Sequence, residues 1–228
     1  MTFILNVLHK DMSLLAADRK ATAKGPTTIT MPGITIHAEG GATIHGYKKL
    51  SVNKAKNLVL GIAGNTQDHA YSKIIENSAS IDDALLVIRT HMEQFLSVHD
   101  RAKIISFTSS TENQGIASFF DEDIGTYFSN IFLFSPVHNY TRLYARTIDG
   151  ARLLHVGSGS DRFEEAVGLE EINSFIASLN GACTPEACIP WIQDAYKKVS
   201  ELDAGTGEDV VFEVSTRTNP EFRSIENG

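Results

Sequence analysis

The sequence predicts an α+β fold, a four-layer αββα sandwich in which two mostly antiparallel sheets lie between pairs of helices. First, the expected elements run as strands, two helices, strands, two helices and one strand. Second, the strands are apolar and the helices amphipathic, so stacked sheets between helices are the simplest packing. Third, the 228 residues are 42% hydrophobic and 21% charged, which supports a full core in one domain spanning residues 1–228.

The chain opens with a predicted pair of strands at residues 3–9 and 12–17, joined by a short polar turn. The segment 23–47 is unusual. Residues 27–31 and 34–37 alternate apolar and polar side chains around a Pro-Gly pair, which predicts an extra hairpin with half-exposed faces.

Two more strands are predicted at residues 48–52 and 58–64. The second is apolar on both faces, as expected of a central strand that is buried on both sides. The period then changes to that of helices, at residues 68–78 and 81–98, and a further strand is expected at 102–108.

The second half begins with residues 110–130, which are polar and contain glycine, and no strand is expected there. The remaining predicted elements are strands at 131–134, 142–147 and 151–156, helices at 161–179 and 185–201, and a closing strand at 209–215. A kink or a shifted start is an open alternative for the last helix, because Pro190 falls in its first turns. The polar tail from about residue 216 is expected to be loosely ordered.

The formal net charge of −8 argues against a general nucleic-acid or anionic-membrane surface. No apolar run approaches the roughly 20 residues of a membrane span, and the N-terminus lacks the pattern of a secretion signal. The expected location is therefore the cytoplasm. Cys183 and Cys188 lack further ligands nearby, so they are expected to be thiols at the start of a helix and neither a metal site nor a disulfide.

Thr2 is the first candidate for chemistry. If Met1 is removed, Thr2 carries a hydroxyl and a free α-amine, which together are a nucleophile and its general base. The ordinary pKa of an α-amine, about 7.7–8.0, suits proton transfer near neutral pH. Thr is also a common second residue, so the case depends on the rest of the chain.

Glycine-containing breaks follow strands or helices at Gly64, at residues 157–159 and at residues 205–207. Such breaks can turn backbone N–H groups outward, as an oxyanion hole requires. None has the spacing of a phosphate-binding loop.

In combination, these features resemble the proteasome β-subunit family of N-terminal-nucleophile hydrolases, over residues 2 to about 215. Residues 15–22 resemble the family's "AADRRAT" segment, with Asp18 sixteen residues after Thr2. Lys49 lies in a strand similar to that of the family's catalytic lysine. The other matching segments are residues 62–64 with Asp68, the "GSGS" at 157–160, and residues 203–207, where Thr206 replaces the usual serine.

The resemblance implies that Thr2 is the nucleophile and that Asp18 holds Lys49 charged beside its hydroxyl. The backbone N–H of Gly64 is implied as the oxyanion donor. Ser158 and Asp203, with Thr206, are expected to help move the proton to or from the Thr2 amine. No cofactor or metal is implied.

For substrate binding, the resemblance implies that the backbones of Thr22, Gly64 and Thr66 pair with an extended peptide. Ala21, Tyr47 and Ile62 are the expected lining of the first specificity pocket, with a preference for apolar side chains. The expected partners are further copies of this chain in a ring or double ring, peptide or unfolded-protein substrates, and an ATPase unfoldase.

The chain departs from the family pattern in two places. The segment between Thr22 and Lys49 is longer than usual, and one additional residue between Lys49 and Gly64 leaves Lys48 open as the catalytic lysine. With no propeptide expected beyond Met1, the chain is most similar to small bacterial self-compartmentalising homologues. The alternatives are a catalytically inactive ring-forming scaffold or an N-terminal-nucleophile amidase acting on small amides.

Overall fold

Two five-stranded sheets form the centre of the structure, and the strands within each pair antiparallel. The computed structural model describes residues 3–23, 27–31, 34–63, 68–87, 90, 113–134, 142–147, 150–181 and 183–226. The first sheet has the order β12 (Ala151–Gly157), β1 (Phe3–His9), β2 (Met12–Asp18), β13 (Val210–Thr216) and β14 (Asn219–Glu226). The second has the order β11 (Arg142–Arg146), β10 (Thr126–Phe134), β9 (Asn113–Asp121), β8 (Leu58–Ala63) and β7 (Leu50–Val52).

Strand β1 shows how the first sheet is covered on both faces. Phe3, Leu5 and Val7 pack in one core cluster with helices α4 (Ser160–Val167), α5 (Leu169–Ser178) and α6 (Pro185–Leu202). Ile4, one residue out of phase, packs instead with side chains of the second sheet. Each fully buried side chain of this size contributes about 1.5–3 kcal/mol, so the apolar run of β1 fixes its central place.

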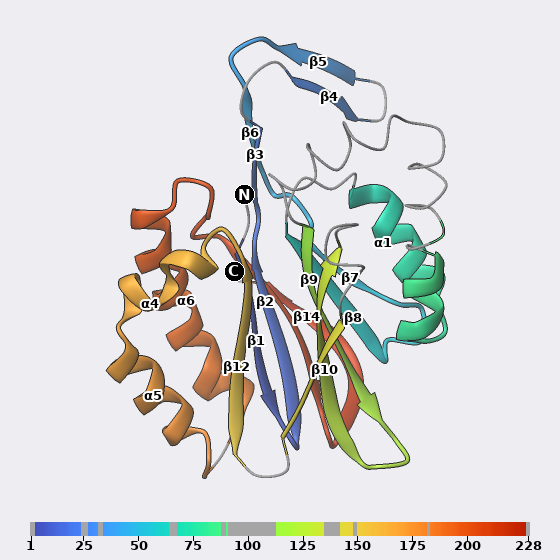
Figure 1. The fold of residues 1–228 in the computed structure, drawn as a ribbon, viewed down its shortest axis with the longest axis vertical. Helices are drawn as coiled ribbons and strands as arrows, with labels where there is room; N and C mark the ends of the chain where they lie inside the picture. The colour runs from blue at the N-terminus through green and yellow to red at the C-terminus, as the bar shows by residue number, and fades with distance from the viewer. Residues whose placement is uncertain are drawn as a thin grey trace.

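The second sheet carries helix α1 (Asp68–Asn77) and the helical residues 81–87 on its other face. Ile75, Ile81 and Ala84 pack there against Leu58 and Leu60 of β8. Figure 1 shows α4, α5 and α6 beside β12 and β1, and α1 on the opposite side of the molecule beside β7 and β8. The fold is therefore mixed α and β, with antiparallel sheets.

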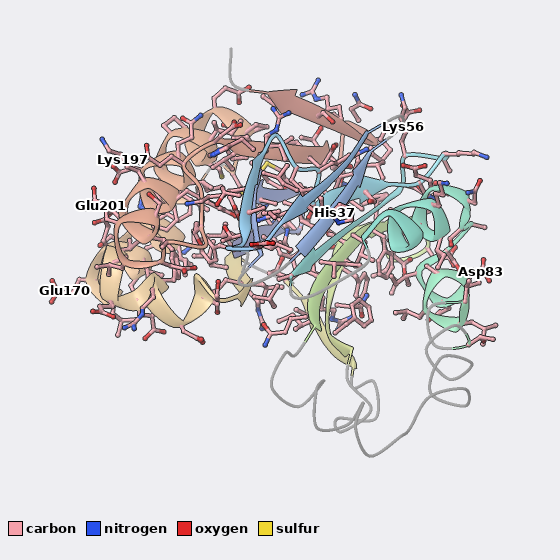
Figure 2. The ribbon with its side chains drawn as sticks, turned by 90° about the horizontal axis from the view of Figure 1, so that it is seen from above. His37, Lys56, Asp83, Glu170, Lys197 and Glu201 are labelled. Atoms are coloured by element: carbon pink, nitrogen blue, oxygen red, sulfur yellow. The ribbon has the colours of Figure 1, made fainter. Side chains whose placement is uncertain are left out.

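The helices direct their charged residues to solvent. Glu170 of α5, and Lys197 and Glu201 of α6, are exposed at the outer surface in Figure 2. None of the helices in the described part of the chain is long and apolar enough to cross a membrane.

The predicted strands at 3–9, 12–17, 58–64, 142–147, 151–156 and 209–215 are confirmed to within one residue at each end. The helices predicted at 68–78 and 185–201 are confirmed as α1 and α6. Thr184 caps α6, Pro185 occupies its first turn, and the helix continues through Pro190. The strand predicted at 102–108 and most of the helix predicted beyond residue 87 lie outside the described residues.

The prediction for residues 110–130 is wrong, because residues 113–121 form β9 and residues 126–130 form the first half of β10. Part of the polarity is misleading, since the side chains of Ser118 and Ser129 lie between the sheets and form hydrogen bonds there. Ser118 contacts Ser13 at 2.7 Å, and Ser129 donates to Asn6 at 2.7 Å and to Ser118 at 3.0 Å. A buried polar side chain is tolerated when such partners are present.

The predicted loose tail from about residue 216 is also wrong, because the residues after Arg217 and Thr218 form β14 at the edge of the first sheet. Phe222 is buried between the sheets, and Ile225 packs on the helix side. An edge strand needs few apolar residues, and charge on it discourages pairing with other chains. Because its composition is polar, this strand is not recognisable from the sequence.

The single helix predicted at 161–179 is two helices. Gly168 has φ +88° and separates α4 from α5. Its N–H donates to Glu164 O at 3.0 Å, and its carbonyl accepts from Ile172 N at 3.1 Å. Glycine adopts this backbone conformation without steric cost, and it ends one helix and starts the next.

The described residues between 23 and 47 extend beyond the two sheets. Strand β3 (Lys20–Ala23) pairs with β6 (Ala42–His45), and β4 (Thr27–Met31) pairs with β5 (Ile34–Ala38) as a hairpin where the sequence predicts one. Figure 1 shows these two pairs of strands, in blue, above the end of the sheets at which β2 ends.

Candidate active site

The topology brings several strand ends to one end of the molecule. Because neighbouring strands are antiparallel, the start of β1 at Phe3 lies opposite the end of β12 at Gly157. The end of β2 at Asp18 lies beside them. In the second sheet, the start of β7 at Leu50 lies next to the end of β8. This is the end above which β3 and β6 project (Figure 1).

Asp18 is the centre of the site. Its side chain is fully buried, and its Oδ1 accepts a hydrogen bond from the N–H of Phe3 at 3.0 Å. Its Oδ2 accepts from the N–H groups of Lys20 and Gly207, both at 3.2 Å, and from Lys49 Nζ at 2.8 Å. A buried carboxylate is stable only when its charge is compensated in this way.

Lys49 supplies a positive charge to this carboxylate and comes from the other sheet. It lies immediately before β7, and its side chain is 2% exposed. The neighbouring Lys48 is exposed. The structure therefore assigns the contact with Asp18 to Lys49 and not to Lys48.

Asp203 organises a second group at the C-terminal end of α6. Its Oδ2 accepts hydrogen bonds from the hydroxyls of Ser158 and Thr206, both at 2.8 Å, and its Oδ1 accepts from Gly205 N–H at 3.0 Å. Burial acts to raise the pKa of the Asp203 carboxyl, but these three hydrogen bonds outweigh it and hold the pKa below its ordinary value. Asp203 is therefore an anion at neutral pH.

The lowered pKa predicts a pH-dependent stability difference. A carboxyl whose pKa is lower in the folded than in the unfolded chain contributes stability above its ordinary pKa of 3.8, and loses it as the pH falls through the folded value. Asp203→Asn is expected to lower the free energy of unfolding by about 1 kcal/mol at pH 7. Urea unfolding at pH 7, 5 and 3 should show this difference shrinking at the lowest pH.

The control for this experiment is Asp123→Asn, at an exposed turn residue. It should unfold like the unsubstituted protein at each pH. A difference between Asp203→Asn and the unsubstituted protein that grows on acidification would contradict a lowered pKa.

The two groups are joined by residues 203–207. Gly207 N–H donates to Asp18, and Lys20 Nζ donates to the carbonyl of Ala204 at 2.7 Å. A Cβ at Gly207 would lie 2.9 Å from the Cβ of Lys20, so no larger residue fits without a shift. The backbone of this segment therefore lies directly against the start of β3.

Two residues that hold the site were missed by the sequence analysis. Tyr196 of α6 is fully buried, and its hydroxyl donates to the carbonyls of Phe3 at 3.0 Å and Ala16 at 2.8 Å. Burial and then the Asp18 charge raise the pKa of this phenol well above its ordinary value, so it stays protonated. Gln114 of β9 accepts from Gly157 N–H at 2.9 Å and ties the second sheet to the segment with Ser158. No local pattern marks either residue.

The structure describes some of the remaining predicted site residues. Ala21 and Thr22 lie in β3, and no residue that the structure describes bonds to the buried Thr22 Oγ1. Tyr47 N–H donates to the carbonyl of Arg19 at 2.9 Å, which extends the pairing of β3 and β6.

Ile62 lies in β8 opposite Lys49, and its N–H donates to the Lys49 carbonyl at 3.4 Å. Thr2, Gly64 and Thr66 lie outside the described residues. Phe3 follows Thr2 directly, and Gly64 follows the end of β8.

Within the ranges that the structure describes, no group of three or more His, Cys, Asp or Glu side chains could hold a metal ion. Compared with models of protein families and with curated proteins, the chain matches none. The case for a function therefore rests on the chemistry of the site and on the order of the motifs.

Proposed function

We propose that the protein is a threonine-type endopeptidase whose nucleophile is Thr2 after removal of Met1. The observation that carries the proposal is the buried contact between Asp18 and Lys49 at 2.8 Å. The same carboxylate accepts the N–H of Phe3, so the ion pair is held beside the residue that follows Thr2. A nearby ammonium stabilises an ionised oxygen and so lowers the effective pKa of a hydroxyl.

The reaction begins when the Thr2 α-amine accepts the proton of the Thr2 hydroxyl and the hydroxyl oxygen bonds to the peptide carbonyl carbon. The carbonyl oxygen becomes an oxyanion, and the N–H of Gly64 is its proposed donor. The carbon–nitrogen bond then breaks, and the Thr2 ammonium gives its proton to the leaving amine. Water, deprotonated by the same amine, hydrolyses the ester that remains on Thr2.

The Asp203 group has a supporting role in this proposal. Asp203 accepts the hydroxyl hydrogens of Ser158 and Thr206, so each of these hydroxyls can act toward other groups only as a hydrogen-bond acceptor. We assign Ser158 to hold the Thr2 ammonium or a bridging water. The negative charge of Asp203 stabilises that ammonium during the proton transfers.

For the substrate, β3 is the proposed docking strand. In this proposal an extended peptide pairs as an extra strand with the backbones of Thr22, Gly64 and Thr66. Ala21, Tyr47 and Ile62 are the proposed lining of the first pocket, which favours apolar side chains. Gly207 and Lys20 fix the other side of this strand to the Asp203 segment.

At the level of the fold, the proposal is the αββα sandwich of N-terminal-nucleophile hydrolases. Support comes from the core clusters, which fill three successive interfaces: helices against the first sheet, sheet against sheet, and the second sheet against α1. Assembly into a ring, an ATPase unfoldase partner and a cytoplasmic location complete the proposal and rest on the resemblance.

The test is covalent trapping on the full-length protein. Its intact mass is expected to be lower than the encoded mass by one methionine residue. A peptide with a C-terminal electrophile is expected to add once per chain, on the proteolytic fragment that begins at Thr2. The same peptide without the electrophile is the control. Retention of Met1, or an adduct on another residue, would overturn the proposal, and a ring without any adduct would favour the scaffold alternative.

A further inference from the structure

The two cysteines lie together at the start of α6, although they are five residues apart in the chain. Thr184 is the N-cap, and its hydroxyl accepts from Ala187 N–H at 3.3 Å. Cys183 therefore precedes the cap and Cys188 is the fourth helical residue, the two positions whose side chains contact each other in a hydrophobic staple. Cys188 is fully buried in the core cluster, and Cys183 packs against the same cluster while remaining half-buried.

The thiols also differ in chemistry. The interaction between the two thiols lowers the pKa of Cys183 and raises the pKa of Cys188. Cys183 is therefore the thiol with more thiolate character, and Cys188 stays protonated. The positive end of a helix also favours a thiolate. An accessible thiolate next to a protonated thiol is the arrangement of an attacking and a resolving cysteine.

A cavity of about 470 Å³ lies close to this pair. It is lined by His9, Lys10, Asp11, Gly150, Asn180 and Gly181. Gly181 is two residues from Cys183, and Asp11 is near enough for its charge to act on the Cys183 thiol. Cys183 is itself only half-buried, so a small polar oxidant such as hydrogen peroxide can reach it from solvent.

We propose that Cys183 and Cys188 form a peroxide-reactive dithiol that closes to a reversible disulfide. The Cys183 sulfur attacks one oxygen of hydrogen peroxide, the oxygen–oxygen bond breaks, and hydroxide leaves and takes up a proton to become water. Cys183 is now a sulfenic acid. The Cys188 sulfur attacks it, the sulfur–oxygen bond breaks, and a second water leaves. The two thiols are oxidised by two electrons and the peroxide is reduced by the same two.

This dithiol is independent of the proposed peptidase site. The 18 residues of α6 separate Cys183 from Asp203 by about 27 Å. The disulfide joins the residue before the helix to its first turn, so oxidation alters the start of α6 and leaves the Asp18–Lys49 contact in place.

The experiment treats the reduced full-length protein with hydrogen peroxide at equimolar dose and follows its intact mass. The mass is expected to fall by about 2 Da, with loss of both free thiols and full recovery on addition of dithiothreitol. In Cys188→Ser, Cys183 is expected to stop at the sulfenic acid, which dimedone captures. Cys183→Ser is the matched variant, in which the remaining buried thiol of Cys188 is expected to stay unmodified.

Two outcomes would overturn the inference. One is unchanged thiols, or direct conversion of Cys183 to a sulfinic acid, in the unsubstituted protein. The other is a disulfide that links two chains. Both are read from the unsubstituted protein, so the test stands even if a serine variant fails to fold.

Discussion

Thr2→Ala is expected to abolish peptide hydrolysis. The substitution removes the hydroxyl that forms the ester and leaves the Asp18–Lys49 pair unchanged, so binding of the peptide should persist while turnover is lost. Removing the nucleophile from a hydrolase of this kind lowers kcat by roughly a factor of 10⁴ or more. The measurement is kcat and KM with a fluorogenic peptide that has an apolar side chain before the cleaved bond.

The matched variant is Thr2→Ser, which keeps a hydroxyl and an α-amine on one residue and is expected to retain measurable turnover. Both variants should unfold at the same urea concentration as the unsubstituted protein. Undiminished turnover in Thr2→Ala would remove Thr2 from the mechanism and would point to contamination or to another nucleophile.

Lys49→Ala is expected to damage both stability and turnover. Asp18 keeps its three backbone donors but loses its cation, so a fully buried carboxylate is left without charge compensation. Removing one partner of a buried ion pair typically lowers the free energy of unfolding by about 3–5 kcal/mol. Because the three backbone donors to Asp18 remain, we expect a loss of about 3 kcal/mol here. Turnover is expected to fall by roughly a factor of 10³, because the hydroxyl loses its electrostatic activation.

The chain supplies a matched control in Lys48→Ala, which removes an adjacent lysine that is exposed. Its free energy of unfolding and its turnover are expected to match the unsubstituted protein. Urea unfolding and peptide hydrolysis together separate the two roles of Lys49, since Lys49→Met restores packing volume without the charge. If Lys48→Ala is the damaging substitution, the assignment of Lys49 is wrong.

Most of the fold follows from local patterns. The uniformly apolar β1 and β2 are recognisable because both faces of these strands are buried. The strands that the sequence did not predict, β9, the first half of β10 and β14, lack that pattern for two different reasons. Strands β9 and β10 carry buried serines whose partners lie on β1 and β2, and β14 is an edge strand with a largely solvated surface. A sequence does not show which distant residues will form hydrogen bonds with each other, nor which strand will lie at the edge of a sheet.

The residues of the candidate site also fall into two groups, those that a sequence motif marks and those that only the tertiary structure reveals. Ser158 and Asp203 lie beside glycine-containing breaks, and Asp18 lies in the segment at residues 15–22 on which the resemblance depends. Tyr196 reaches Phe3 across 193 residues, and Gln114 reaches Gly157 across 43. Tyrosine in a helix and glutamine at a strand start are ordinary residues, and only the tertiary contact gives them a role.

The serine and asparagine contacts between the sheets have a consequence for the site. Apolar faces attract each other without direction and can slide, whereas hydrogen bonds hold only in one alignment. Asp18 belongs to one sheet and Lys49 to the other, and a slip of one residue moves a strand by about 3.3 Å. That displacement would move the two charges apart from their 2.8 Å contact and break it. The polar centre of the core therefore sets the distance between Asp18 and Lys49, and a core made only of hydrocarbon would leave it variable.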